Sequence, residues 1–190
     1  MENETVHIIT RRLEDWYSVN KRQLPWRETS DPYLIWLSEV ILQQTRVDQG
    51  LDYFLRFSKR FPRVQDLAVA EEDEVLKLWQ GLGYYSRARN LHAASKMIVA
   101  KFDGEYPNSY KEILSLRGVG EYTASAIASI SFNQPFAVVD GNVYRVLSRL
   151  FAIDDFIDTT QGKKYFSELA ANLLDRDNPG LYNQAIMDFG

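Results

Sequence analysis

The sequence contains no cysteine and only two histidines among its 190 residues. The lack of cysteine excludes disulfide bonds and thiolate metal sites within this chain. Because His7 and His92 are not accompanied by a carboxylate cluster at ligand spacing, we expect no metal in this chain. A cysteine-free sequence is also compatible with a cytoplasmic location.

Long hydrophobic runs are missing as well, and no stretch approaches the length of a membrane span. The first residues, MENETVHIITRRLEDWY, carry early acids and no uninterrupted apolar region, which is unlike a signal peptide. We therefore expect no membrane partner.

Positive charge is not in excess, since 22 Lys and Arg stand against 26 Asp and Glu. A net charge of −4 argues mildly against a nucleic-acid partner, because such proteins are often basic. Basic residues do gather locally, as at Arg11 and Arg12, and again at Arg87, Arg89 and Lys96. These groups are either solvated faces or parts of a binding surface.

Hydrophobic residues make up 45% of the chain, which is enough for a core in one domain or two small lobes. Their helical spacing predicts an all-α fold, with one short extended piece at 136–139. The expected helices cover the region from Val6 to Tyr17 and the ranges 33–44, 47–60, 66–79 (in one or two pieces), 84–101, 109–116, 121–130, 142–151, 163–174 and 180–189. Asp31-Pro32 is expected to open the helix at 33–44, with Asp31 as its cap and Pro32 in its first turn.

The stretch Leu116-Arg117-Gly118-Val119-Gly120-Glu121-Tyr122-Thr123-Ala124 predicts a turn between two helices. Glycine leaves the backbone bare, so amides at the start of the second helix can bind a phosphate. Val119 is expected to pack between the helices. The alternative is an ordinary helix–helix turn, since glycines two apart are a weak signal alone.

Two carboxylates stand out. Asp140 follows the extended apolar piece and precedes a helix, so it is either a helix N-cap or a functional acid. Glu39 lies in the apolar run Trp36-Leu37-Ser38-Glu39-Val40-Ile41-Leu42, where it is either buried or on a surface stripe. Burial raises the pKa of carboxyl groups in general, which suits a general acid.

With these features the chain resembles the helix-hairpin-helix base-excision repair glycosylases, the superfamily that includes endonuclease III. The resemblance implies two helical lobes with the active site between them. One is a six-helix-barrel-like lobe at 22–134 containing the hairpin motif at 108–131, and the other combines 1–21 with 135–190. It also implies that Glu39 protonates the leaving base and activates water, that Asp140 stabilises the charged sugar, and that Asn142 assists the water or the carboxylate.

Tyr122 stands where bifunctional relatives carry the lysine that attacks the sugar as a Schiff-base nucleophile. Without an amine at this position, we expect base removal without strand cleavage.

Four further stretches resemble the adenine DNA glycosylases that act on A opposite 8-oxoguanine: Leu24-Pro25-Trp26-Arg27, residues 36–45, Gly81-Leu82-Gly83-Tyr84-Tyr85-Ser86-Arg87, and Asp140-Gly141-Asn142-Val143. The implied partner is double-stranded DNA with an A:8-oxoguanine or A:G mispair. The implied base-pocket residues are Trp26, Arg27, Leu42 and Gln184, and the implied DNA-binding residues are Gln43, Gln44, Thr45, Tyr84, Arg87, Gly118, Val119 and Gly120.

Some of these residues have plainer interpretations. The resemblance places Tyr84 beside 8-oxoguanine and Gln44 inside the duplex, whereas a tyrosine at a helix start is ordinarily a core aromatic. Arg87 and Arg89 either contact phosphate or form salt bridges on a helix face. The alternative functions are a thymine-mismatch glycosylase and a non-catalytic helix-hairpin-helix DNA-binding fragment.

In this family a four-cysteine loop holding a 4Fe-4S cluster follows the last segment of the sequence. We therefore expect the cluster ligands to lie beyond residue 190 of a longer protein, and weak activity or none from this fragment alone. The resemblance also implies an alkali cation at the turn carbonyls of residues 116–121. We expect a monomer in the bacterial cytoplasm, associated with the nucleoid.

Overall fold

The structure, a computed structural model, describes residues 3–154 and 156–190, and within these ranges it contains helices and no strand. The predicted all-α class is confirmed. The chain divides into two compact units, Met1–Gln23 with Ala128–Gly190 and Leu24–Ile127, which we call the terminal unit and the middle unit. The sequence-based expectation places these boundaries near residues 22 and 134.

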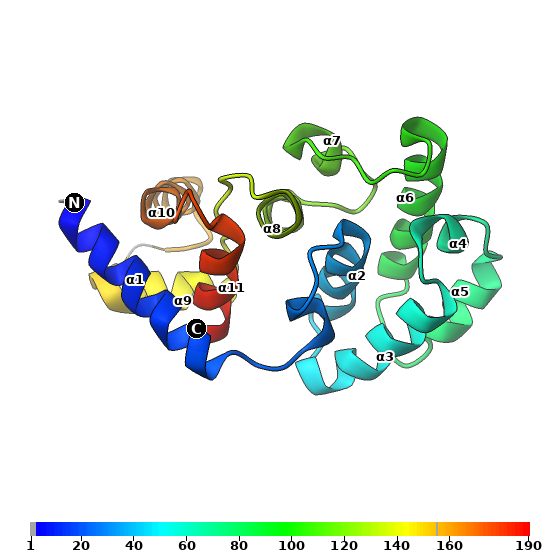
Figure 1. Ribbon diagram of the computed structural model, residues 1–190, viewed down its shortest axis with the longest axis horizontal. Helices are drawn as coiled ribbons and strands as arrows, with labels where there is room; N and C mark the ends of the chain where they lie inside the picture. The colour runs from blue at the N-terminus through cyan, green and yellow to red at the C-terminus, as the bar shows by residue number, and fades with distance from the viewer. Residues whose placement is uncertain (1–2, 155) are drawn as a thin grey trace. The chain divides into compact units, whose positions relative to one another are not determined.

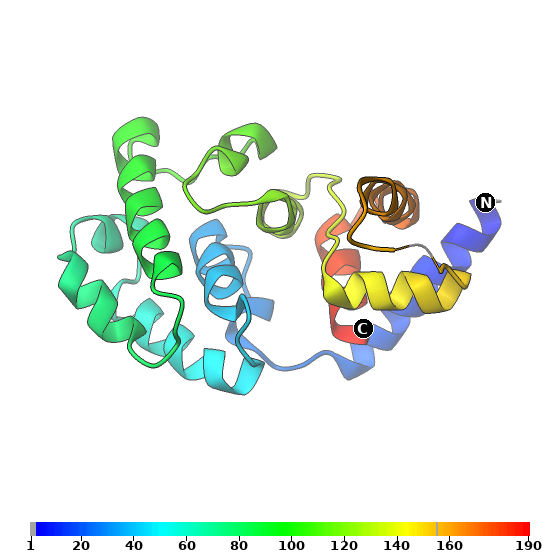
Figure 2. The same ribbon diagram turned by 180° about the vertical axis from the view of Figure 1, so that it is seen from behind.

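The middle unit is built around the buried helix α2. This helix packs against α3 and α6, and α6 also packs against α4 and α5 (Figures 1 and 2). The elements of this unit are η1 (Pro25–Arg27), α2 (Pro32–Leu42), α3 (Val47–Arg60), α4 (Val64–Ala68), α5 (Glu72–Trp79), α6 (Ser86–Phe102) and α7 (Tyr110–Leu114).

Helix α2 begins as its sequence predicts. The Asp31 side chain accepts a hydrogen bond from the Tyr33 amide at 2.8 Å, and Pro32 occupies the first turn. The helix ends at Leu42, two residues before the predicted end at residue 44. The prediction was wrong here because Gln44 takes a left-handed conformation with φ of 55°, which cannot continue a right-handed helix.

The terminal unit joins the two ends of the chain. Helix α1 packs against α10 and α11, and α9 packs against the same two helices. Its elements are α1 (Asn3–Asn20), the end of α8 (Glu121–Phe132), α9 (Gly141–Phe151), α10 (Thr160–Leu173) and α11 (Pro179–Phe189). Thr10 donates a hydrogen bond to the Leu173 carbonyl and Tyr17 donates one to Gln184 Oε1, so polar contacts also fix α1.

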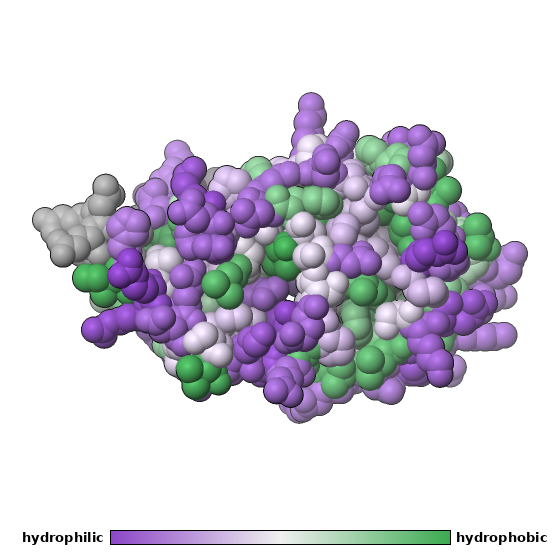
Figure 3. All heavy atoms as spheres, viewed as in Figure 1, coloured by the Kyte–Doolittle hydropathy of each residue, from purple (hydrophilic) through white to green (hydrophobic). Residues whose placement is uncertain are grey.

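Hydrophilic side chains cover much of the face shown in Figure 3, with smaller hydrophobic patches between them. The most exposed large hydrophobic residues, Val19, Val69 and Phe156, lie far apart in the sequence. No helix in the described ranges is both long enough and apolar enough to cross a membrane.

A pair of acids in the terminal unit makes its stability depend on pH. Burial and the neighbouring Asp175, which shares a hydrogen bond with Glu14, raise the pKa of Glu14 from 4.5 to about 7. The folded state therefore holds a proton that the unfolded chain releases near pH 4.5. This contribution is complete below pH 4.5 and is lost as the pH rises to about 7.

We expect the free energy of unfolding to fall by about 1 kcal/mol between pH 5 and pH 8, a value reduced for solvent screening because Glu14 is only partly buried. Chemical denaturation of wild type, Glu14→Gln and the exposed control Glu105→Gln checks this. Glu14→Gln should remove the fall and Glu105→Gln should keep it. An equal fall in all three proteins would show that a group other than Glu14 causes the pH dependence.

Candidate active site and nucleic-acid interface

Glu39 is a buried carboxylate in the middle unit. It lies on α2 with 8% of its surface exposed, between the buried Ser38 and Val40. The interpretation of Glu39 as a surface residue is therefore wrong. Glutamate is rarely buried in proteins, and buried carboxyl groups are common at functional sites.

Asp140 caps α9 in the terminal unit. Its Oδ1 accepts hydrogen bonds from the amides of Asn142 at 3.0 Å and Val143 at 2.9 Å. Its Oδ2 accepts a third from the Asn142 side-chain amide at 3.1 Å, and Asn142 Oδ1 in turn accepts from Arg145. The N-cap interpretation is confirmed. Three donors hold this carboxylate in one orientation, which a functional acid also requires.

Asn183 fixes the segment that leads to Asp140, and sequence reasoning missed it. This side chain is fully buried on α11 and donates to Ser129 Oγ and to the Phe136 carbonyl, both at 2.8 Å. Its Oδ1 accepts from the Val138 amide at 3.2 Å. The side-chain amide thus supplies hydrogen-bond partners for backbone groups of an extended segment that has no neighbouring strand. A signal was present, because Asn183 lies in an otherwise largely apolar part of its helix.

The predicted hairpin turn lies at residues 115–120, between α7 and α8. Helix α7 ends at Leu114, two residues earlier than predicted. Val119 is 8% exposed, as expected for a residue packed between helices, whereas Gly118 and Gly120 are exposed. The bare backbone of the turn therefore faces solvent directly before the first turn of α8.

Gly118 is required by two features of the structure. Its φ is +79°, and a Cβ there would lie 2.7 Å from the Cβ of Asn90 on α6. Asn90 Oδ1 also accepts a hydrogen bond from Arg117 Nε at 3.1 Å, so this asparagine positions the turn. No sequence pattern indicates this role of Asn90, because α6 and the hairpin are separate segments.

We expect Gly118→Ala to lower the free energy of unfolding by about 1–2 kcal/mol, because it adds both backbone strain and a clash with Asn90. Gly120→Ala is the matched control, since nothing lies within 4 Å of a Cβ at Gly120. Its effect should stay within about 0.5 kcal/mol. Urea denaturation measures both, and an equal loss in the two variants would contradict the steric account.

Tyr122 occupies the second residue of α8 and is half-buried. No lysine stands at this position, so the hairpin offers a phenol where a Schiff-base mechanism needs an amine. Lys111 and Arg117, the basic residues nearest in the hairpin sequence, are both exposed.

The residues expected to enter the duplex are on two surface loops of the middle unit. Gln44 lies in loop 43–46, between α2 and α3, and Tyr84 lies in loop 80–85, between α5 and α6. Both residues have positive φ, 55° and 46° respectively. Tyr84 is 65% exposed, so its interpretation as a core aromatic is wrong.

The expected base-pocket residues are more buried than the loop residues. Trp26 is 3% exposed and its ring meets Phe54 edge-on at 5.0 Å between centroids. Leu42 is half-buried at the end of α2, and Gln184, in the terminal unit, is 8% exposed with its Oε1 bound to the Tyr17 hydroxyl. Arg27 is half-buried beside Trp26 in η1.

The two arginines expected at phosphates have other contacts. Arg89 pairs with Glu72 at 3.3 Å, which is the salt-bridge alternative. Arg87 donates hydrogen bonds to backbone carbonyls of both surface loops, among them those of Gln43 and Gly83. The Arg87 Nη1 and Nη2 groups therefore face the protein's own oxygens, whereas its Nε has no hydrogen-bond partner among the described residues. The role of Arg87 at a phosphate stays a prediction.

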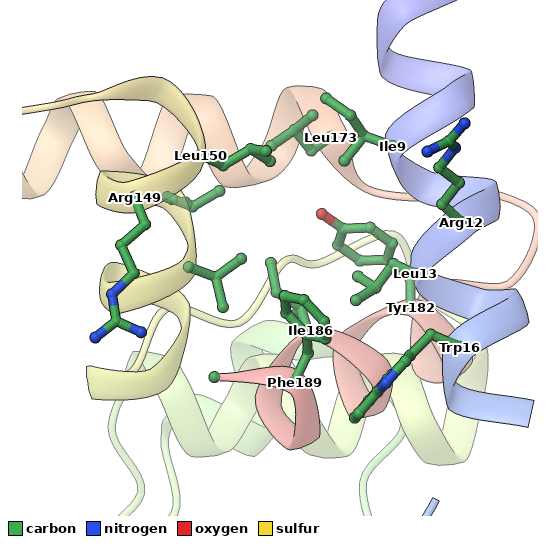
Figure 4. Close-up of a pocket in the computed structure, with 13 residues that line it drawn as sticks. Ile9, Arg12, Leu13, Trp16, Arg149, Leu150, Leu173, Tyr182, Ile186 and Phe189 are labelled. Atoms are coloured by element: carbon green, nitrogen blue, oxygen red, sulfur yellow. The ribbon is translucent and has the colours of Figure 1, made fainter. Parts of the chain in front are cut away.

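A pocket of about 430 Å³, partly open to solvent, lies in the terminal unit between α1, α9, α10 and α11. Leu13 and Leu150 line it, and the Tyr182 hydroxyl points into it (Figure 4). Burial raises the pKa of Tyr182, whose hydroxyl has no hydrogen-bond partner among the described residues. No lining residue is Asp or Glu, and the polar side chains in the lining are those of Arg12, Trp16, Arg149 and Tyr182.

Metal ligands are scarce. No group of three His, Cys, Asp or Glu side chains in the described part of the chain could hold an ion. Since the chain contains no cysteine, residues 1–190 supply no thiolate for an iron–sulfur cluster. The alkali cation at carbonyls 116–121 stays a prediction.

Residues 37–172 match the family described as HhH-GPD superfamily base excision DNA repair protein. Similar curated proteins include the adenine DNA glycosylases of Arabidopsis thaliana, 42% identical over 100% of this chain, and of Mus musculus, 44% identical over 94%. The chain spans only 34% and 36% of the lengths of these two relatives.

Solved structures with the same fold include a thermostable thymine-DNA glycosylase, with a TM-score of 0.88 and 27% identity. The match covers 98% of this chain and 86% of that one. An endonuclease III in a non-covalent complex with DNA has a TM-score of 0.81 and 20% identity, covering 100% of this chain and 86% of that one.

Proposed function

Because the chain belongs to the HhH-GPD superfamily of base excision DNA repair proteins, we propose that it carries the catalytic part of a DNA glycosylase that removes adenine mispaired with 8-oxoguanine or guanine. The observation that carries the proposal is the burial of Glu39 on an otherwise apolar helix. The similarity to adenine DNA glycosylases at 42–44% identity supports the choice of base.

Hydrolysis of an N-glycosidic bond needs a proton for the leaving base and compensation for positive charge on the sugar, as in glycoside hydrolysis. In this proposal Glu39 donates the proton to the leaving adenine and then accepts a proton from the attacking water. The Asp140 carboxylate, held by the Asn142 and Val143 amides, stabilises the oxocarbenium-like sugar. Glu39 belongs to the middle unit and Asp140 to the terminal unit.

The reaction ends at the abasic site in this proposal. Tyr122 has no amine with which to attack the sugar, so no Schiff base forms at the hairpin. Base release and strand cleavage are then separate events, and only the first is assigned to this chain.

The hairpin holds the DNA backbone. Amides of Gly118 and Gly120 and the N-terminal end of α8 form a phosphate site that carries no sequence information. Its exposed glycines support this role. The Val119 amide already donates to the Leu116 carbonyl at 3.1 Å, so Val119 contributes to this site by packing rather than by its amide. A local site of this kind also explains how a chain with net charge −4 binds DNA.

Recognition of the mispair is assigned to the two surface loops. Removing adenine requires the base to leave the stack, and the gap must be filled by side chains. Gln44 and Tyr84 are exposed on loops 43–46 and 80–85, with an amide and an aromatic ring suited to insertion. Residues 43 and 45 flank Gln44 and complete the contact.

Thymine removal from G:T mispairs is the second candidate, because the similar thymine-DNA glycosylase has a TM-score of 0.88. Its identity of 27% is lower than that of the adenine enzymes, which ranks it second. A non-catalytic DNA-binding role would leave the burial of Glu39 unexplained.

The test is a panel of labelled duplexes containing A:8-oxoguanine, A:G, G:T or A:T. Alkali after incubation cleaves each abasic strand, and the protein is assayed at its natural length. Cleavage of the adenine strand in the first two duplexes is expected. Cleavage only in G:T would favour the second candidate, and cleavage in none would refute the glycosylase proposal.

Borohydride trapping tests the role of position 122. Because no amine is available there, the wild-type protein should give no covalent protein–DNA product, whereas endonuclease III, assayed with its own substrate, is the positive control. Efficient trapping of the wild type would contradict base removal without strand cleavage.

A further inference from the structure

Loops 43–46 and 80–85 each hold one residue in a backbone conformation that needs support. Gln44 and Tyr84 have φ of 55° and 46°, although neither is glycine. A left-handed conformation costs a non-glycine residue roughly 1–2 kcal/mol and persists only where neighbours hold it in place. Something in the middle unit must therefore stabilise both loops.

One side chain contacts both. Arg87, in the first turn of α6, donates from Nη1 to the carbonyls of Val40 and Ile41, each at 3.1 Å, and to that of Gln43. Its Nη2 lies 3.3 Å from the Leu82 carbonyl and 3.4 Å from the Gly83 carbonyl. The first set ends helix α2 and opens loop 43–46, and the second belongs to loop 80–85.

The chemistry of the acceptors explains why an arginine is present. The last carbonyls of a helix have no partner within the helix and carry the negative end of its dipole. The Arg87 guanidinium supplies charge-assisted hydrogen bonds to them from a planar group with several donors. A lysine ammonium is a single point and cannot reach the two sets of carbonyls in the same way.

Aromatic rings enclose the same guanidinium. Arg87 Cζ lies 5.1 Å from the ring centroid of Trp79 and 5.7 Å from that of Tyr84. The Trp79 indole also donates to the Gly83 carbonyl at 2.9 Å. Burial lowers the pKa of Arg87 from its ordinary value, but an arginine remains protonated in proteins. The cation is thus in contact with Tyr84 itself.

We propose that Arg87 is a positioning residue that joins loops 43–46 and 80–85, so that Gln44 and Tyr84 engage the mispair as one preorganised element. The inference rests on the proposed function for its effect on DNA. The physical link between the loops stands independently of it. A preorganised pair of side chains avoids ordering two separate loops when the duplex binds.

The link can be measured without DNA. In the wild-type chain, hydrogen exchange of the amides should show that residues 43–45 and residues 82–84 open with the same free energy. In Arg87→Lys, exchange in both loops should accelerate by about 10-fold, the loss expected when charge-assisted hydrogen bonds to carbonyls are removed. Arg89→Gln, which breaks only the exposed pair with Glu72, is the matched control and should change neither loop.

A second measurement tests the consequence for recognition. Affinities for A:8-oxoguanine and undamaged A:T duplexes are compared in a Glu39→Gln background, which prevents turnover. Arg87→Lys should reduce the preference for the mispair by about 10-fold and leave binding to A:T within about 2-fold. A phosphate ligand would instead weaken both duplexes equally and lower the salt dependence.

These readouts separate the possible failures. Unchanged exchange, or acceleration in only one loop, overturns the positioning role, and so does equal weakening of both duplexes. If the two loops open together but the wild-type protein binds both duplexes equally well, the proposed function is overturned and the link between the loops stands. If Arg87→Lys does not fold, the hydrogen-exchange measurement on the wild-type protein remains. Different opening free energies for the two loops would then overturn the inference.

Discussion

Replacing Glu39 by glutamine is expected to reduce the rate of adenine release by about 1000-fold, because the amide can neither donate the proton to the leaving base nor activate water. Glutamine has nearly the same shape, and α2 buries position 39 among residues that the substitution leaves untouched. The variant should therefore fold and still bind DNA. Single-turnover rates at saturating protein measure the chemical step.

Glu105→Gln is the matched control, since it removes an exposed carboxylate from the same unit. It should release adenine at the wild-type rate. Residual activity of Glu39→Gln within 10-fold of wild type would show that Glu39 is a structural acid and that the proton comes from another group.

Asp140→Asn should lower the rate of adenine release by about 100-fold, because it removes the negative charge that is proposed to stabilise the sugar. Its side-chain oxygen can still accept from the Asn142 and Val143 amides, so the cap of α9 is retained. The free energy of unfolding should change by no more than about 0.5 kcal/mol.

Asp140→Ala separates the two roles of this residue. It loses the charge and the cap together, so we expect the same loss of rate and a further loss of stability of about 1 kcal/mol. Denaturation curves beside single-turnover rates provide the comparison. An asparagine variant with wild-type activity would mean that Asp140 only caps the helix.

Much of the fold follows from the sequence. The 3.6-residue spacing of apolar side chains placed α3 at its observed bounds, Val47–Arg60, and Asp31-Pro32 marked the start of α2. The end of α2 was missed because it depends on the left-handed Gln44, which a side chain on α6 supports. Local patterns do not contain such contacts.

The candidate site was predictable in part. The sequence singled out Glu39 and Asp140 but left each with two interpretations, since burial and hydrogen bonds are tertiary properties. The structure decided for a buried Glu39 and showed the cap at Asp140. It also gave Arg87 contacts that no charge pattern indicates, because an arginine bound to carbonyls looks the same in sequence as one that binds phosphate.

The most direct test of the account is the identity of the free base. Single-turnover incubation of the natural protein containing this chain with an A:8-oxoguanine duplex, followed by mass spectrometry, should detect free adenine and an uncleaved strand bearing an abasic site. Glu39→Gln should yield neither product. Release of a different base, or adenine release that Glu39→Gln leaves unchanged, would contradict the assignment of this chain as an adenine glycosylase that works through Glu39.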